Sequence, residues 1–160
     1  MSSESVEFRP FELRDIKAVY EIEKASFPRP WPKFSFLLFH YREPQGFKVA
    51  AISGQVIGYF IVSIEPKEAG AQENMAHLMN LAVHPNFRRI KIGRRLLEDS
   101  IAYAAERGVD RIELEVNVMN QTARELYRKM GFVENNIIKG YYEDEEDAIV
   151  MTKKNARKLR

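Results

Sequence analysis

Five basic residues crowd around one glycine, Gly93, in the stretch HPNFRRIKIGRRLL, residues 84–97. They are Arg88, Arg89, Lys91, Arg94 and Arg95. An apolar strand-like run ends at Val83, and a helical apolar pattern starts directly after Gly93. The N-terminus of a helix already carries partial positive charge and free backbone N–H groups, so the added positive charge favours a bound anion. Arginine and lysine side chains beside such a helix start suit a phosphate or diphosphate.

The same basic run has two simpler interpretations, a solvated charged surface and a nucleic-acid-binding patch. The phosphate interpretation is favoured because the charges are predicted to lie in a loop rather than along one exposed helical stripe. Gly93 also lets the backbone come close to a ligand. The formal net charge of the whole chain is only +2, so the basic run is a local feature and general polyanion binding is disfavoured.

Length and composition indicate one globular domain with an ordinary core. Of the 160 residues, 45% are hydrophobic and 30% are charged, which is usual for globular proteins. The chain has no cysteine, which excludes disulfides, thiolate metal sites and a cysteine nucleophile. It shows no apolar run long enough to cross a bilayer and no signal-peptide pattern. We therefore expect a single domain over residues 1–160, cytoplasmic and without membrane contact, with a basic tail at residues 153–160.

Hydrophobic periodicity predicts strands and helices that alternate along the chain. The predicted strands are residues 6–10, 47–53, 56–65, 75–84, 111–118, 132–142 and 146–153. The predicted helices are residues 12–27, 33–43, 94–107 and 120–130. Gly54 and Gln55 are expected to form a hairpin turn, Asn120 to cap the last helix, and the apolar strand 75–84 to be covered on both faces. This order predicts an α/β fold, a mixed sheet flanked by helices.

The stretch LMNLAVHPNFRRIKIGRRLL, residues 78–97, resembles the cofactor segment of the GNAT superfamily of N-acetyltransferases. In that pattern Gln or Arg is followed by two residues, Gly, one residue, and Gly or Ala. Arg88 and Gly93 match the first and last positions, whereas Lys91 replaces the first glycine. The resemblance implies that the anion is the pyrophosphate of acetyl-CoA. The residues implied to bind it are Arg88, Arg89, Ile90, Lys91, Ile92, Gly93 and Arg94.

Three further segments resemble the same family. The segment LEVNVMNQTARELYRKMGF, residues 114–132, has the family spacing of an Asn, an Ala and a Tyr on one helix, here Asn120, Ala123 and Tyr127. Residues 25–32 and 140–151 resemble loops of the branch that acetylates alpha-amino groups of ribosomal and other proteins. The resemblance implies a mostly antiparallel, seven-stranded mixed sheet flanked by about four helices. The further cofactor contacts that it implies are Leu81, Ala82 and Val83 through backbone groups, with Asn120 and Tyr127.

Acetyl transfer from a thioester to an amine needs a base for the amine and an acid for the departing thiolate, without a covalent enzyme intermediate. Glu115 is the predicted base, because it lies on the polar side of an alternating strand and the resemblance implies a base there. Glu113 and Asn117 share that side, so alternation alone leaves the choice open. Tyr127 is the predicted acid, and its simpler interpretation is a half-buried packing residue. A backbone N–H of the strand before the basic loop is expected to hold the thioester oxygen.

Two aromatic segments are predicted to flank the acceptor. They are Phe27, Pro28 and Trp31 on one loop, and Tyr141 and Tyr142 on another. The alternative is an aromatic cluster that only packs the two loops together. The three histidines show no metal-ligand spacing, so no metal is expected, and His77 is interpreted as a hydrogen-bonded core residue.

The sequence therefore predicts an enzyme that moves an acetyl group from acetyl-CoA to the alpha-amino group of peptide or protein N-termini. Acetylation of lysine side chains or small amines on the same fold is the alternative. A non-catalytic acyl-CoA or nucleic-acid-binding module is disfavoured by the presence of both Glu115 and Tyr127. The expected partners are peptide N-termini. The basic tail is interpreted as a flexible end, with docking on ribosomal RNA as the alternative. A monomer or weak dimer is expected, and an auxiliary subunit is left open.

Overall fold

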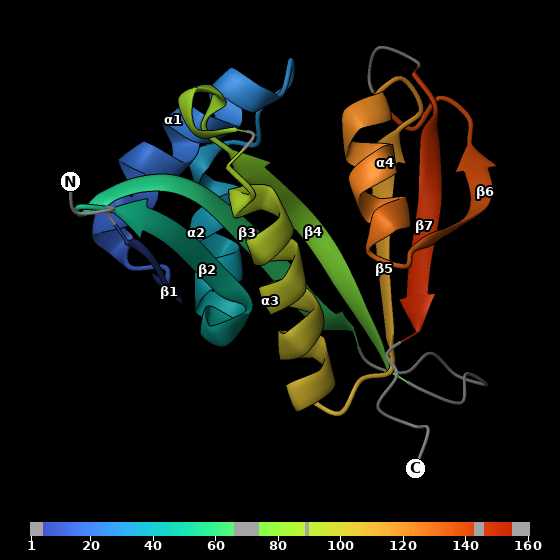
Figure 1. Ribbon diagram of the computed structural model, residues 1–160, viewed down its shortest axis with the longest axis horizontal. Helices are drawn as coiled ribbons and strands as arrows, with labels where there is room; N and C mark the ends of the chain where they lie inside the picture. The colour runs from blue at the N-terminus through green and yellow to red at the C-terminus, as the bar shows by residue number, and fades with distance from the viewer. Residues whose placement is uncertain (1–4, 66–73, 89, 143–145, 155–160) are drawn as a thin grey trace. The chain divides into compact units, whose positions relative to one another are not determined.

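The computed structural model describes residues 5–65, 74–88, 90–142 and 146–154 (Figure 1). Its strands are β1 Val6–Pro10, β2 Phe47–Ile52, β3 Gln55–Glu65, β4 Met75–Val83, β5 Arg111–Asn117, β6 Val133–Ile138 and β7 Ala148–Lys154. Its α-helices are α1 Ile16–Ser26, α2 Lys33–Arg42, α3 Ile92–Glu106 and α4 Gln121–Lys129. This order confirms the predicted one. Within the described ranges, no helix has the length and apolar character that crossing a membrane requires.

The strands form one seven-stranded sheet in the order β1-β2-β3-β4-β5-β7-β6. β4 and β5 pair in parallel, with Ala76 opposite Ile112 and His77 opposite Glu113. The pairs β1–β2, β2–β3, β5–β7 and β6–β7 are antiparallel. The predicted α/β class, with a mostly antiparallel mixed sheet and about four helices, is confirmed. The chain divides into two compact units, Met1–Ser63 with Asn80–Ser100, and Ile64–Met79 with Ile101–Arg160. We describe each unit by itself, and the single domain stays a prediction.

Helices cover both faces of the strands in the first unit. Tyr59 of β3 packs against Phe36 of α2, with ring centroids 5.8 Å apart and the rings nearly perpendicular. The preceding residue, Gly58, faces the other way, where an added Cβ would lie 3.0 Å from a methyl carbon of Leu96 in α3. Successive strand residues point to opposite faces of a sheet. α2 and α3 therefore lie on opposite faces of these strands, as Figure 1 shows.

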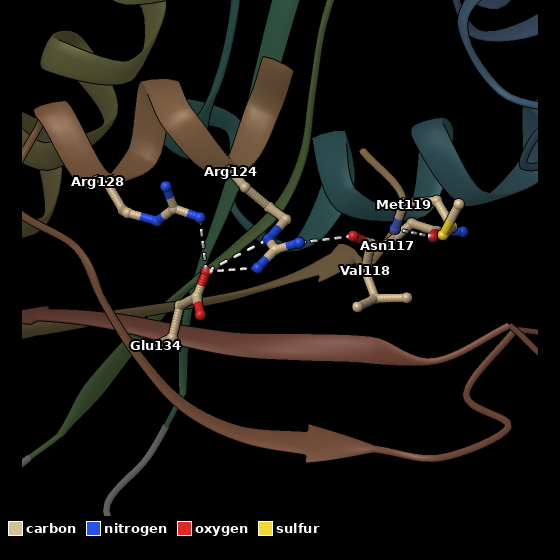
Figure 2. A network of polar contacts seen from close by, with 6 residues as sticks. All are labelled: Asn117, Val118, Met119, Arg124, Arg128 and Glu134. Atoms are coloured by element: carbon tan, nitrogen blue, oxygen red, sulfur yellow. Dashed lines mark hydrogen bonds and ion pairs between the residues drawn. The ribbon is translucent and has the colours of Figure 1, made fainter. Parts of the chain in front are cut away.

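A polar network fixes α4 in the second unit (Figure 2). The Arg124 guanidinium donates to Glu134 of β6 at 3.1 and 3.3 Å, and to the Val118 carbonyl at 2.8 Å. Arg128 donates to the same Glu134 oxygen at 3.3 Å. The hydrogen bond from Arg124 is the largest cause of a lowered pKa at Glu134. The network ties α4 to β6 and to the turn after β5, which leads directly into Asn120.

Short-range signals in the sequence set the helix ends. The side chain of Asn120 accepts a hydrogen bond from the N–H of Ala123 at 3.1 Å, so the predicted cap is confirmed. Gly108 and Gly131 follow the ends of α3 and α4 with φ of 75° and 94°. This left-handed conformation suits glycine after the last helical turn.

Two predicted details are wrong, and a third needs refinement. The β2–β3 turn is centred on Ser53 and Gly54 rather than on Gly54 and Gln55, because both central residues of this turn have positive φ, 49° and 80°. No residue of β4 is exposed, but the cover of this strand is partly polar, because half-buried His77 and Asn80 contact carboxylates. Lys153 and Lys154 of the predicted tail pair within β7, and the tail residues 155–160 lie outside the described residues.

α3 begins at Ile92, earlier than predicted, so Ile92, Gly93 and Arg94 belong to its first turn. The preceding residue, Lys91, has a φ of 65°, and its carbonyl accepts the N–H of Arg95 at 3.1 Å. This left-handed conformation costs on the order of 1 kcal/mol for a residue with a Cβ atom. The lysine therefore adopts the backbone conformation for which a glycine is suited.

We expect Lys91→Gly to raise the free energy of unfolding by about 1 kcal/mol, because glycine adopts positive φ without the steric cost. Lys91→Ala is the matched control, since it removes the same charge but keeps the Cβ atom. Urea unfolding at one pH measures both variants. Equal stability of the glycine and alanine variants would contradict the steric explanation.

Candidate active site

The second unit holds the predicted base in a row of three ionisable side chains. His77 of β4 lies between Glu115 of β5, with Nε2 2.6 Å from Oε2, and Glu65 at the end of β3, with Nδ1 2.9 Å from Oε1. The side chains of His77 and Glu115 are 17% and 16% exposed, so water screens their contact only partly. Glu115 is therefore held in one position by a side chain from another strand.

The two carboxylates decide the charge on His77. Ionised carboxylates only accept hydrogen bonds, so an imidazole between two of them donates from both ring nitrogens. Burial lowers the pKa of His77, but the hydrogen bonds to Glu115 and Glu65 outweigh burial and raise the pKa to about 9. At neutral pH His77 is therefore an imidazolium ion paired with Glu115.

Three tyrosines of the same unit concern the candidate chemistry, and two of them, Tyr141 and Tyr142, lie close enough to Glu115 to be affected by its charge. Tyr127 of α4 is buried, and burial raises its pKa to about 12. Tyr141 and Tyr142 follow β6 in a loop, with ring centroids 4.9 Å apart and the rings nearly perpendicular. Burial raises the pKa of Tyr142, and the charges of Tyr141, Glu115 and Tyr127 add to this effect. Burial followed by the charge of Glu115 raises the pKa of Tyr141. Tyr142 is thus affected by the charges of both the predicted base, Glu115, and the predicted acid, Tyr127.

In the first unit, every second residue at the end of β4 points its backbone N–H and C=O groups away from β3. The N–H of His84 donates to the Ile57 carbonyl of β3 at 2.7 Å. Hydrogen-bonding direction alternates along a strand, so Ala82 also points its backbone groups toward β3, whereas Leu81 and Val83 point theirs to the opposite edge. Of the three residues predicted to bind the pantetheine arm through the backbone, only Leu81 and Val83 have the right direction.

The basic segment is partly neutralised from within the chain. Arg94 donates to Glu98 at 3.2 Å and Arg95 to Asp99 at 3.1 Å, each one helical turn further along α3. Together Lys91, Arg94, Arg95 and Glu98 line an open hollow at the start of the helix. The carboxylates of Glu98 and Asp99 therefore supply part of the negative charge that is predicted near the start of this helix. A hollow with basic walls at a helix N-terminus also fits a diphosphate.

The other residues of the predicted cofactor segment differ in what they can contribute. Arg88 donates from Nε to the Val83 carbonyl at 3.0 Å and from a terminal nitrogen to the Ser26 hydroxyl at 3.1 Å. Its guanidinium therefore joins the end of β4 to the end of α1. Ile90 is exposed, but Ile92 is buried, so only the backbone of Ile92 can face a ligand. Arg89 lies outside the described residues.

The loop after α1 is held in place by aromatic packing and by a backbone hydrogen bond. The Trp31 ring packs on Phe36 and Phe39 of α2, with ring centroids 5.7 and 5.5 Å apart. The backbone N–H of Phe27 donates to the Glu23 carbonyl at 3.0 Å and ends α1. Pro28 is exposed. Trp31 therefore packs against α2, and its contact with the acceptor stays a prediction.

Sequence reasoning assigned no catalytic role to His77 and missed Glu23 and Asn80. His77 is hydrogen-bonded, as predicted, but its partner is the candidate base. Periodicity places His77 and Glu115 on half-buried faces of separate strands and cannot pair them, because the pairing of β4 with β5 is set by the fold. Among the described residues, no group of three His, Asp or Glu is arranged to hold a metal ion.

Comparison with protein families gives one match over most of the chain. The family described as Acetyltransferase (GNAT) matches residues 16–132. An uncharacterised N-acetyltransferase of Methanocaldococcus jannaschii is 37% identical over 147 residues, which cover 91% of this chain and 90% of the relative. An N-alpha-acetyltransferase of Sulfurisphaera tokodaii is 33% identical over 150 residues, 89% of each chain.

Comparison with solved structures agrees. Naa20 of Chaetomium thermophilum, crystallised in complex with a bisubstrate analogue, superposes with a TM-score of 0.86 and 27% identity. The match covers 96% of this chain and 88% of that protein.

We expect the ion pair of His77 to make folding stability depend on pH. The raised pKa of the folded protein means that this stabilisation is complete below the ordinary value of 6.5 and is lost as the pH rises through about 9. The loss is on the order of 3 kcal/mol. His77→Gln should flatten this part of the stability profile, measured by urea unfolding between pH 6 and pH 10.

Glu65→Gln serves as the companion variant. It removes one of the two carboxylates, so the pKa of His77 in the folded protein should be lower, and the fall in stability should be smaller and end at lower pH than in the unmodified protein. A wild-type profile that is flat across this window, or one unchanged by His77→Gln, would show that His77 is not charged in the folded protein.

Proposed function

Because the chain belongs to the GNAT acetyltransferase family, we propose that it transfers the acetyl group of acetyl-CoA to free alpha-amino groups of peptide or protein N-termini. The observation that carries this proposal is the cluster of Glu115, Tyr127, Tyr141 and Tyr142 in one unit. It combines a group that can accept a proton, a buried hydroxyl that can give one, and two aromatic side chains beside them. The N-alpha-acetyltransferase relative supports the choice of acceptor.

Acetyl-CoA supplies an activated acetyl group as a thioester. Its pyrophosphate is proposed to bind at the start of α3, where Lys91 and Arg94 line the open hollow and the free N–H groups of the first helical turn add partial positive charge. The Leu81 carbonyl and the Val83 N–H are proposed to bind the pantetheine arm as an added strand would be bound, because the backbone groups of both residues point away from β3. The Leu81 N–H donates to Asn80, and the Val83 carbonyl accepts from Arg88. Asn120 caps α4 and so fixes the helix that carries Tyr127.

Glu115 is proposed to take the proton from the attacking amine, directly or through one water molecule. The nitrogen then bonds to the acetyl carbon as the carbon–sulfur bond breaks. His77 orients the carboxylate by holding Oε2 at 2.6 Å. A fixed orientation matters because proton transfer needs hydrogen-bond distance and alignment.

Tyr127 is proposed to protonate the departing sulfur. Its pKa, raised to about 12 by burial, keeps the hydroxyl protonated at neutral pH, so a proton is available when the thiolate forms. A hydroxyl with a high pKa is a weak acid in the resting enzyme, but it can donate to a basic thiolate within hydrogen-bond reach. Tyr127 lies on α4, whose position the Arg124 network fixes.

Tyr141 and Tyr142 are proposed to contact the acceptor backbone with their hydroxyl groups and its first side chain with their rings. Phe27 and Pro28, on the loop after α1, are also proposed to contact the acceptor. The free alpha-amine of an extended chain reaches such a site at its end, whereas a lysine within a chain brings backbone on both sides. Ribosome contact, a cytoplasmic location and a monomeric or weakly dimeric state stay predictions.

We expect the enzyme to acetylate a peptide with a free N-terminus and no lysine at least about tenfold faster than one with a blocked N-terminus and an internal lysine. The reason is steric, because a free N-terminus brings backbone into the acceptor site on one side only, whereas an internal lysine brings it on both sides. The measurement is transfer of labelled acetyl groups from acetyl-CoA to both peptides at equal concentration. Equal or faster acetylation of the blocked peptide would favour a lysine acetyltransferase.

We expect Glu115→Gln and Tyr127→Phe each to lower kcat by about a hundred- to ten-thousand-fold, the usual contribution of a general base or acid. Both variants should still be stabilised against heat by acetyl-CoA, because neither removes the proposed phosphate site. Glu113→Gln is the matched control on the same strand face and should keep near-normal turnover. If Glu113→Gln is the damaging variant, the base is Glu113.

A further inference from the structure

A buried carboxylate of the first unit joins three segments of the chain. Glu23, near the end of α1, is 1% exposed. Its Oε1 accepts the backbone N–H of Trp31 at 3.1 Å. Its Oε2 accepts the hydroxyl of Tyr59 and the Nδ2 of Asn80, the latter at 2.7 Å. A carboxyl group removed from water needs such donors, because an unpaired buried carboxylate is very unfavourable.

The chemistry of this cluster fixes the orientation of the Asn80 amide. The Glu23 carboxylate can only accept, so the Asn80 side chain must present its NH₂ group to it. Burial and the nearby Glu23 charge raise the pKa of Tyr59, so its hydroxyl keeps its proton and donates as well. The Asn80 Oδ1 is consequently turned toward the backbone, where it accepts the N–H of Leu81 at 3.1 Å.

Leu81 and Trp31 belong to the two parts of the chain on which substrate binding is proposed to depend. Leu81 lies on the outward edge of β4, proposed for the pantetheine arm. Trp31 closes the loop of Phe27 and Pro28, proposed for the acceptor. A continuous path of hydrogen bonds joins these two backbone N–H groups through Glu23 and Asn80. We infer that Glu23 is a positioning residue, which acts through Asn80 and through the Trp31 backbone to align the acceptor loop with the acetyl-CoA strand.

This inference rests on the proposed function and extends it. The carboxylate touches neither the acceptor nor the reacting acetyl group, so its effect is on the alignment of the two substrates. Displacements of reacting groups by about 1 Å can lower rates by about a hundredfold. Loss of the Glu23 contacts should therefore lower kcat/KM by more than the accompanying loss of folded protein.

An exchange of polarity between Glu23 and Asn80 tests the inference. Glu23→Gln places an NH₂ group against the donors around it, and Asn80→Asp places two carboxylates face to face. In the double variant, the glutamine NH₂ can donate to the new aspartate, its carbonyl can accept the Trp31 N–H, and the aspartate can accept the Leu81 N–H. The contacts of Trp31, of Leu81 and between the two side chains are thus restored, with donor and acceptor reversed in the last of them. The Tyr59 hydroxyl, 3.1 Å from the Asn80 side chain in the wild type, can donate to the new aspartate.

We expect each single variant to lower kcat/KM for the free-N-terminus peptide at least about tenfold after correction for folded fraction, and the double variant to recover to within about threefold of wild type. Neighbouring residues in one hydrogen-bond network commonly show coupling of this size. Tyr59→Phe is the control, because it removes a donor to the same buried carboxylate but leaves both ends of the path intact. It should lower stability while kcat/KM stays within about threefold of wild type.

Amide hydrogen exchange supplies a readout that does not depend on catalysis. The Trp31 and Leu81 amides should be protected in the wild-type protein, exchange at least about tenfold faster in both single variants, and regain protection in the double variant. If wild type transfers no acetyl group to peptides, the proposed function fails, and the exchange rates alone decide the positioning of these amides.

Two results would overturn the inference. One is a double variant that is no better than the worse single variant in activity or in amide protection. The other is a set of single variants whose kcat/KM falls only in proportion to folded protein. Should the single variants not fold, the wild-type measurement still decides, since unprotected Leu81 and Trp31 amides would show that the path is absent.

Discussion

A charge that leaves water must meet a partner, and this constraint organises both units of the chain. Asp15 is 5% exposed and accepts two hydrogen bonds from Arg9, at 2.7 and 2.9 Å, which fixes the start of the first helical region against β1. Glu23 meets three donors. Glu115 is hydrogen-bonded to His77, whose other ring nitrogen is hydrogen-bonded to Glu65. Each pair joins separate segments, so the buried charges help to determine which backbone segments lie side by side. The positions of the candidate site residues depend on these contacts.

Strand alternation then divides structural from chemical roles. On β3, Tyr59 points to α2 and reaches Glu23, whereas Gly58 makes room for α3. On β4, the hydrogen bond from His84 to β3 sets the direction of the residues before it, so Leu81 and Val83 present backbone groups to the opposite edge. A shift of one residue in either strand would exchange these roles. The register therefore matters more to the proposed chemistry than the identity of the apolar side chains.

The start of α3 shows how much a basic helix N-terminus can be balanced internally. Glu98 and Asp99 each pair with an arginine one turn earlier, and such exposed pairs contribute only a few tenths of a kcal/mol. They reduce the local positive charge without closing the hollow beside Lys91. The left-handed conformation of Lys91 is better explained by the geometry of the loop than by the charge of its side chain, because the strain arises at the Cβ atom.

The sequence by itself determined the order of strands and helices, the Asn120 cap, the glycine helix ends and the resemblance on which the family assignment first rested. These features depend on periodicity or on hydrogen bonds between residues a few positions apart, so a short window of sequence contains both partners. The partner of Glu115 is 38 positions away, and Asn80 is 57 positions from Glu23. Only the tertiary structure could decide these contacts, because strand pairing and helix packing bring such residues together and no local pattern records the distance between them.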